Sequence, residues 1–72
     1  MNIKAGQTVE LQRTIDRHDL HVDSGQIGKV LKVFVIKQAG GDRRGTNHAL
    51  VDFAGIKATV RLTSIRHRKD LP

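Results

Sequence analysis

The fold is decided by residues 56–62, which read Ile56-Lys57-Ala58-Thr59-Val60-Arg61-Leu62. Apolar residues occupy every second position of this run, and Lys57, Thr59 and Arg61 fill the positions between them. Such an alternation predicts a β-strand that buries one side and turns the other toward solvent. The solvent-facing side of this strand is therefore predicted to be basic.

A second alternating run precedes this strand and forms a hairpin with it. The run is Ala49-Leu50-Val51-Asp52-Phe53, and its apolar face holds Ala49, Val51 and Phe53. Ala54-Gly55 joins the two runs. Since glycine takes a positive φ without steric cost, Gly55 favours a tight turn and an antiparallel pair.

Residues 29–37 predict a long strand that carries apolar side chains on both faces. Strict alternation places Leu31, Val33 and Val35 on one face. The other face then holds Val30, Phe34 and Ile36, and Lys32 interrupts it. Either the strand bends between two sheets of a barrel, or a dimer contact covers it, and we favour the bend. Phe34 and Phe53 are both expected in the core.

The remaining segments complete an all-β domain that spans residues 1–72. Residues 8–13 predict a short strand, and Thr63-Ser64-Ile65 predicts a turn of 3₁₀ helix before a short last strand or a tail. The turn formers of residues 14–28 and 38–47 predict loops. We expect a small SH3-like barrel of about five strands, because a barrel leaves no unpaired edges.

Two short motifs carry a family resemblance. Gly28-Lys29-Val30 resembles the KOW motif of ribosomal and transcription-factor proteins, and Ile3-Lys4-Ala5-Gly6-Gln7-Thr8-Val9 resembles the segment that opens their barrels, with Gln7 in place of the usual Asp. The resemblance implies an SH3-like barrel and supports the fold more than a function. The hairpin of residues 49–55 is also similar to that of hydrogenase-maturation chaperones, but Asn2 stands where they need cysteine.

Composition limits the classes of function. The chain has 72 residues, no cysteine and a formal net charge of +6. A domain this small encloses no deep substrate pocket, so we expect no enzyme and no cofactor. The missing cysteines exclude disulfides and thiolate-bound metals. No apolar run is long enough for a membrane span or a signal peptide, which predicts a cytoplasmic protein that binds no membrane.

The basic charge is concentrated in the second part of the chain. Residues 1–27 hold three basic and four acidic residues, a net charge of −1, whereas residues 28–72 hold ten and three, a net charge of +7. This asymmetry predicts a non-enzymatic module that contacts the phosphate backbone of DNA or RNA. The candidate binding residues are Arg43 and Arg44 in a glycine-rich loop, Lys57 and Arg61 on the strand, and Arg66 and Arg68 in a basic C-terminal tail that starts at about residue 66.

Three alternatives stay open at this stage. The first is an interaction module or accessory subunit that docks on an acidic partner protein, and the second is a homo-oligomer. The third is a metal site at His18 and His21, although surface histidines are the simpler interpretation. Because base stacking needs exposed aromatic rings, a core position for both phenylalanines favours a duplex or a structured nucleic acid over a single strand.

Overall fold

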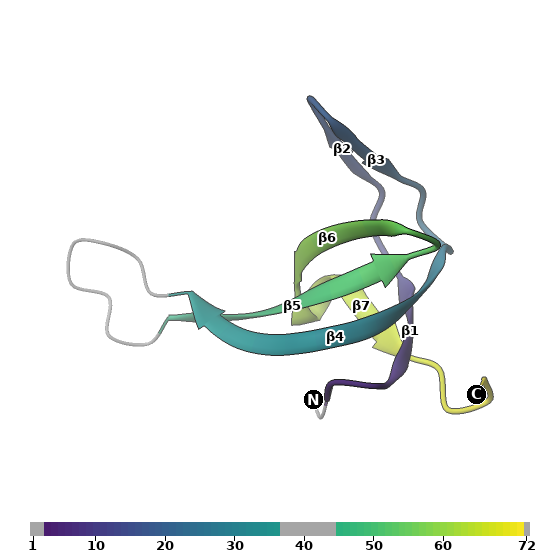
Figure 1. Ribbon diagram of the computed structural model, residues 1–72, viewed down its shortest axis with the longest axis vertical. Helices are drawn as coiled ribbons and strands as arrows, with labels where there is room; N and C mark the ends of the chain where they lie inside the picture. Colours follow the sequence, from purple (N-terminus) through teal and green to yellow (C-terminus); the bar gives the residue numbers. More distant parts are fainter. Residues whose placement is uncertain (1–2, 37–44, 72) are drawn as a thin grey trace.

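The computed structural model describes residues 3–36 and 45–71. Within these ranges the chain is all-β and contains a single turn of 3₁₀ helix (Figure 1). The strands are β1 (Thr8–Leu11), β2 (Ile15–Arg17), β3 (Leu20–Val22), β4 (Ile27–Ile36), β5 (Thr46–Phe53), β6 (Ile56–Arg61) and β7 (Ile65–His67), and the 3₁₀ turn η1 covers Leu62–Ser64. No helix in the described part is long and apolar enough to cross a membrane.

Five strands form the main sheet in the order β6-β5-β4-β1-β7, and every pair is antiparallel. The predicted strands at residues 29–37, 49–53 and 56–62 correspond to β4, β5 and β6. Asn47 and Thr46, which were predicted in a loop, already belong to β5. The Ala54-Gly55 turn is confirmed as a tight hairpin, with φ values of 53° and 95°. Positive φ at both residues is what a type I′ turn requires.

The core lies on one face of this curved sheet. Its largest fully buried side chains are Phe53, Leu11, Val9, Val30 and Val51. Phe53 packs where β4 passes over the core at Gly28. A Cβ on Gly28 would lie 2.6 Å from Phe53 Cδ1 and 2.7 Å from Val51 Cγ1, closer than side-chain atoms approach one another. Gly28 is therefore required by the close packing of β4 on Phe53.

A β-bulge in β4 changes which side chains face the core. Val30 pairs with Val51, but the next pair is Lys32 with Leu50, so Leu31 is an extra residue. Beyond the bulge Lys32 and Phe34 lie on the outer face, and Val33 lies on the side of the buried Ala49. The expectation that Phe34 is in the core is therefore wrong. Had β4 alternated strictly, Lys32 would share the face of Val30, and a buried charge is costly.

The end of β4 projects away from the core together with β5 (Figure 1). Side chains on both sides of this ribbon are exposed: Leu31, Val33, Val35 and Ile36 expose between 39% and 51% of their surface. The ribbon of β4 is strongly curved (Figure 1). We call these four residues the apolar stripe.

Two further predictions need correction. Residues 14–28 are not a continuous loop, because β2 and β3 pair there as a hairpin that projects from the main sheet (Figure 1). Its Ile15 and Leu20 pack against the core, and Val22 is buried in it. The predicted basic tail also begins as a strand: Arg66 and His67 belong to β7, which pairs with β1. The Arg68 amide then donates to the carbonyl oxygen of Thr8.

Gly28→Ala tests the packing at the β4 crossing. We expect the added methyl to lower the free energy of unfolding by about 1–3 kcal/mol, the usual cost of overpacking a core. Lys29→Ala, at the neighbouring exposed position of β4, should change it by less than about 0.5 kcal/mol. Urea unfolding followed by circular dichroism measures both. Equal midpoints for Gly28→Ala and the unsubstituted chain would show that the crossing is not tightly packed.

Candidate nucleic-acid interface

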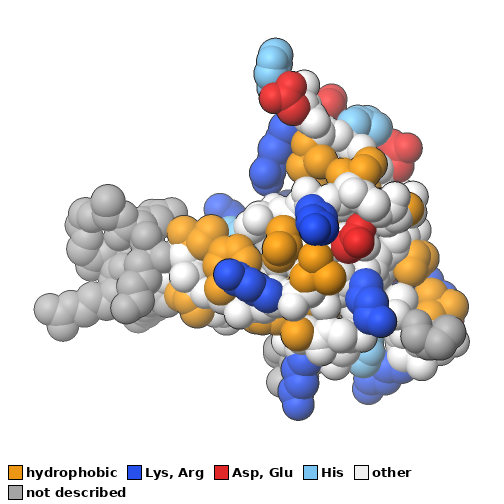
Figure 2. Space-filling model, in the orientation of Figure 1, with side chains coloured by type: hydrophobic (Ala, Val, Ile, Leu, Met, Phe, Trp, Pro, Cys, Tyr) orange, Lys and Arg blue, Asp and Glu red, His pale blue; other side chains and the backbone are white. Residues whose placement is uncertain are grey.

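The outer face of β4, β5 and β6 gathers basic side chains from two strands. Residues paired across an antiparallel ladder point to the same side of the sheet. The pairing gives three rows across the strands, which are Lys29-Asp52-Lys57, Lys32-Leu50-Thr59 and Phe34-His48-Arg61. All four basic residues of these rows are exposed. We call this surface the outer face, and in the view of Figure 2 basic and hydrophobic side chains alternate over β4 and β5.

The third row consists of flat side chains. The rings of Phe34 and His48 are stacked, with centroids 6.1 Å apart and planes 22° from parallel. His48 Nδ1 donates a hydrogen bond of 2.8 Å to the carbonyl oxygen of Thr46, which fixes the imidazole ring. Lys32 Nζ lies 5.4 Å from the centroid of the Phe34 ring, at the distance of a cation–π contact. Arg61, in register with His48, completes the row on β6.

A cleft between the β2–β3 hairpin and β6 adds two arginines to Arg61. The cavity has a volume of about 290 Å³ and is lined by Arg13, Thr14, Ile15, Asp16, Arg17, Val60, Arg61 and Ser64. Three guanidinium groups therefore border one depression, which we call the arginine cleft. Within the described residues, none of the three forms an ion pair. Free guanidinium groups around a shared depression suit an anion with several oxygens.

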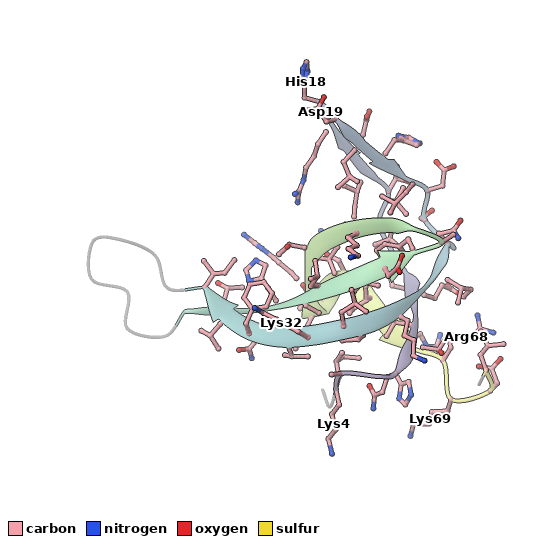
Figure 3. All side chains as sticks on the ribbon, viewed as in Figure 1. Lys4, His18, Asp19, Lys32, Arg68 and Lys69 are labelled. Atoms are coloured by element: carbon pink, nitrogen blue, oxygen red, sulfur yellow. The ribbon has the colours of Figure 1, made fainter. Side chains whose placement is uncertain are left out.

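Three carboxylates, those of Asp16, Asp19 and Asp23, lie on or beside the β2–β3 hairpin, whose tip carries His18 and Asp19 (Figure 3). His21 is held between two carboxylates: its Nε2 lies 2.8 Å from Asp23 Oδ1, and its Nδ1 lies 3.6 Å from Asp16 Oδ1. The hydrogen bond with Asp23, followed by that with Asp16, raises the pKa of His21. Across the described residues, no group of three or more His, Asp or Glu side chains is arranged to hold a metal ion.

Arg68 is engaged by two carboxylates, unlike the arginines of the cleft. Its Nη2 lies 2.6 Å from Asp70 Oδ2, and its Nη1 lies 2.5 Å from Glu10 Oε1. These bonds, with that to Asp70 first, raise the pKa of Arg68. The guanidinium in turn holds the pKa of Asp70 at about 2. Arg68 fastens the C-terminal segment to β1, and its charge is largely balanced there.

The predicted binding residues therefore fall into four groups, one of which is Arg68, held by Asp70 and Glu10. Lys57 and Arg61 are brought together on the outer face. Arg66 is exposed on β7, the opposite edge of the sheet, where it pairs in register with Glu10. There it borders a second depression of about 510 Å³ with His67 and Lys69. Arg43 and Arg44 lie outside the described residues.

Sequence reasoning missed the contributions of Arg13, Arg17 and Phe34. The two arginines belong to the N-terminal part whose net charge is negative, and only the fold of the β2–β3 hairpin brings them beside β6. Phe34 was assigned to the core because strict alternation put it there. The signal that pointed to the bulge was Lys32, the one charged residue on an otherwise apolar face.

Comparisons of the chain with protein-family models, with curated proteins and with solved structures give no match.

The Arg68–Asp70 contact can be tested by titration. A pKa near 2 means that the contact stabilises the fold above the ordinary carboxyl value of 3.8, and that this stabilisation is lost as the pH falls toward about 2. Arg68→Ala should return the Asp70 pKa toward 3.8, and Arg66→Ala should change it less, because Arg66 acts only through its distant charge. Carboxyl ¹³C NMR follows the titration. An unchanged Asp70 pKa in Arg68→Ala would refute the ion pair.

Proposed function

We propose that this chain is a non-enzymatic, cytoplasmic module that binds the phosphate backbone of nucleic acid through the outer face and the arginine cleft. The observation that carries the proposal is that six exposed basic side chains, Arg61 among them, lie on the outer face or line the arginine cleft. Four of them stand on the outer face, and Arg13 and Arg17 join Arg61 in the cleft.

Few carboxylates lie near this surface, and each of them has another partner. Asp52 is the single acidic residue in the three rows of the outer face, and its Oδ1 accepts a hydrogen bond of 2.7 Å from the amide of Gly55. Asp16, in the cleft, is drawn toward His21. Uncompensated positive charge at this density attracts polyanions, and arginine binds phosphate through two parallel hydrogen bonds.

We further propose that the main sheet closes into an SH3-like barrel of the KOW-like kind. Two features support this. Consecutive strands β4, β5 and β6 are paired, and the last strand returns beside the first, so that β7 and β4 flank β1. In addition, a 3₁₀ turn stands directly before β7. Small barrels of this kind commonly bind on a surface rather than in a pocket, which agrees with a backbone-binding role.

Salt dependence tests the proposed function with a matched pair of variants. Each phosphate contact steepens the fall of log affinity with log salt by about 0.7–0.9. Arg17→Gln with Arg61→Gln should therefore reduce the slope by about 1.5 and weaken binding roughly tenfold at low salt. Lys4→Gln with Lys69→Gln removes the same charge outside this surface (Figure 3) and should change the slope little. Fluorescence anisotropy of a labelled oligonucleotide measures both.

Two results would contradict the proposal. If no DNA or RNA, duplex or single-stranded, binds at low salt, the chain is not a nucleic-acid module. If the two double variants lose the same slope and affinity, net charge alone drives association, and the outer face and arginine cleft have no special role.

The apolar stripe favours a second candidate, a protein-interaction module. Exposed aliphatic side chains gathered on a projecting ribbon are typical of surfaces that a partner covers. Either the acidic partner expected from the net charge or a second copy of the chain would place its own apolar residues on the stripe.

Val33→Thr with Val35→Thr tests the second candidate, because threonine keeps the shape of valine and adds a hydroxyl. For self-association, light scattering should give a mass above 8.0 kDa that rises with concentration, and the variant should be monomeric. For an acidic partner, one defined protein should be recovered after nuclease treatment by the unsubstituted chain and not by the variant. A monomer that recovers no such protein would rule this candidate out.

A further inference from the structure

We infer that the row Phe34-His48-Arg61 is a platform on which bases of single-stranded nucleic acid stack. This inference rests on the proposed function and deepens it, since it names the form of nucleic acid that the outer face binds. It reverses the expectation of a duplex partner, which depended on Phe34 being in the core.

The Phe34 ring lies on the outer face of the sheet. The bulge at Leu31 moves Phe34 to the outer face, where it is only partly buried. Phe53, the other aromatic residue, fills the core and exposes only 1% of its surface. The fold thus uses one phenylalanine for packing and holds the other where a ligand can reach it. A ring on an exposed sheet face is a recurrent stacking site for unpaired bases.

The Phe34 and His48 rings of the platform are already ordered. His48 supports one side of the Phe34 ring at 6.1 Å, and the hydrogen bond to Thr46 holds the imidazole in place. Arg61 pairs with His48 on the next strand, and a guanidinium plane also stacks on bases. Because the Phe34 and His48 rings already rest against each other and a hydrogen bond holds the imidazole, little of their side-chain freedom is lost when a base binds.

Lys32 stands beside the platform and can contact the phosphates of a bound strand. Its ammonium group covers the Phe34 ring at 5.4 Å without any carboxylate partner within the described residues. A base that displaces the flexible lysine from the ring leaves the charge free to contact the adjoining phosphate. Arg61 also borders the arginine cleft, so a strand whose base lies on the platform has phosphate-binding groups at both ends of the row.

Duplex ends aside, a double helix covers the faces of its bases and offers only their edges and the backbone. The platform therefore distinguishes single strands from duplexes. One stacked base typically strengthens binding by roughly 5- to 150-fold. Because stacking reads the face of the base and not its edge, sequence preference should be weak.

The test uses the absence of Trp and Tyr from the chain. Phe34→Trp places the sole indole on the platform, and Phe34→Leu keeps an apolar side chain without a ring. The probes are oligonucleotides of about 12 nucleotides, which is within the usual site sizes: oligo(dT), oligo(rU), and an abasic strand with the same number of phosphates. The two base-containing probes distinguish DNA from RNA as the ligand.

We expect Phe34→Trp to bind oligo(dT) or oligo(rU) at least as tightly as the unsubstituted chain, with quenching of the indole fluorescence. The abasic strand should bind more weakly and quench little. Phe34→Leu should lose roughly tenfold in affinity for the base-containing strands and none for the abasic strand. Circular dichroism checks that Phe34→Leu is folded, and the quenching in Phe34→Trp is a readout independent of that variant.

The outcomes separate this inference from the proposed function. If base-containing and abasic strands bind equally and the indole is not quenched, backbone binding stands and the platform is refuted. If no strand binds at low salt, the proposed function itself fails. If a duplex binds more tightly than the single strands and Phe34→Leu binds all probes normally, the outer face is a duplex-binding surface and the platform is again refuted.

Discussion

The β-bulge at Leu31 is the feature on which the arrangement of the surface depends. Before the bulge, Gly28 and Val30 face the core, and after it Val33 faces the same side. One extra residue thus lets Lys29 and Lys32, an odd and an even position, stand on the same face. Without it Lys32 would have to be buried or the pairing with β5 would slip, which would turn every side chain of β5 to the other side.

Alternation predicted the strands well where it was regular. Ala58 and Val60 of β6 and Ala49, Val51 and Phe53 of β5 are buried as expected, but Ile56, predicted on the same buried face of β6, exposes 43% of its surface. Alternation gave the wrong face where a strand departed locally from the period of two. Phe34 was placed on the wrong side because a bulge is invisible to a strict period of two. The β2–β3 hairpin was missed because its strands have three residues each, and Asp and His surround the few apolar ones that anchor it.

The candidate site was predictable only in the part that lies on one regular strand. Lys57 and Arg61 are four residues apart on β6, so their common face follows from the sequence. The arginine cleft depends on a contact between the hairpin and β6, which no local pattern encodes. Arg68 illustrates the opposite error, because the sequence suggested a binding residue that the fold engages elsewhere. Its charge looks available in the sequence, but Asp70 and Glu10 hold it in the folded chain.

The fold therefore separates basic from acidic side chains more completely than their order along the chain does. Three carboxylates and two histidines lie on or beside the β2–β3 hairpin, which projects away from the main sheet (Figures 1 and 2). Arg13 and Arg17 are in the acidic part of the chain, yet they border the cleft beside β6. A polyanion that approaches this protein meets attraction over β4 to β6 and repulsion at the hairpin tip, which restricts the path of a bound strand.

Mapping by NMR tests the central claim, that the bulged outer face is the binding surface. A ¹⁵N-labelled sample is titrated with oligo(dT) at low salt, and amide shifts are followed residue by residue. The account predicts that the largest changes occur at Lys32, Phe34, His48 and Arg61, with small changes at Asp19 and Asp70. Changes concentrated on the β2–β3 hairpin tip or on the C-terminal segment, or no changes at saturating oligonucleotide, would contradict it.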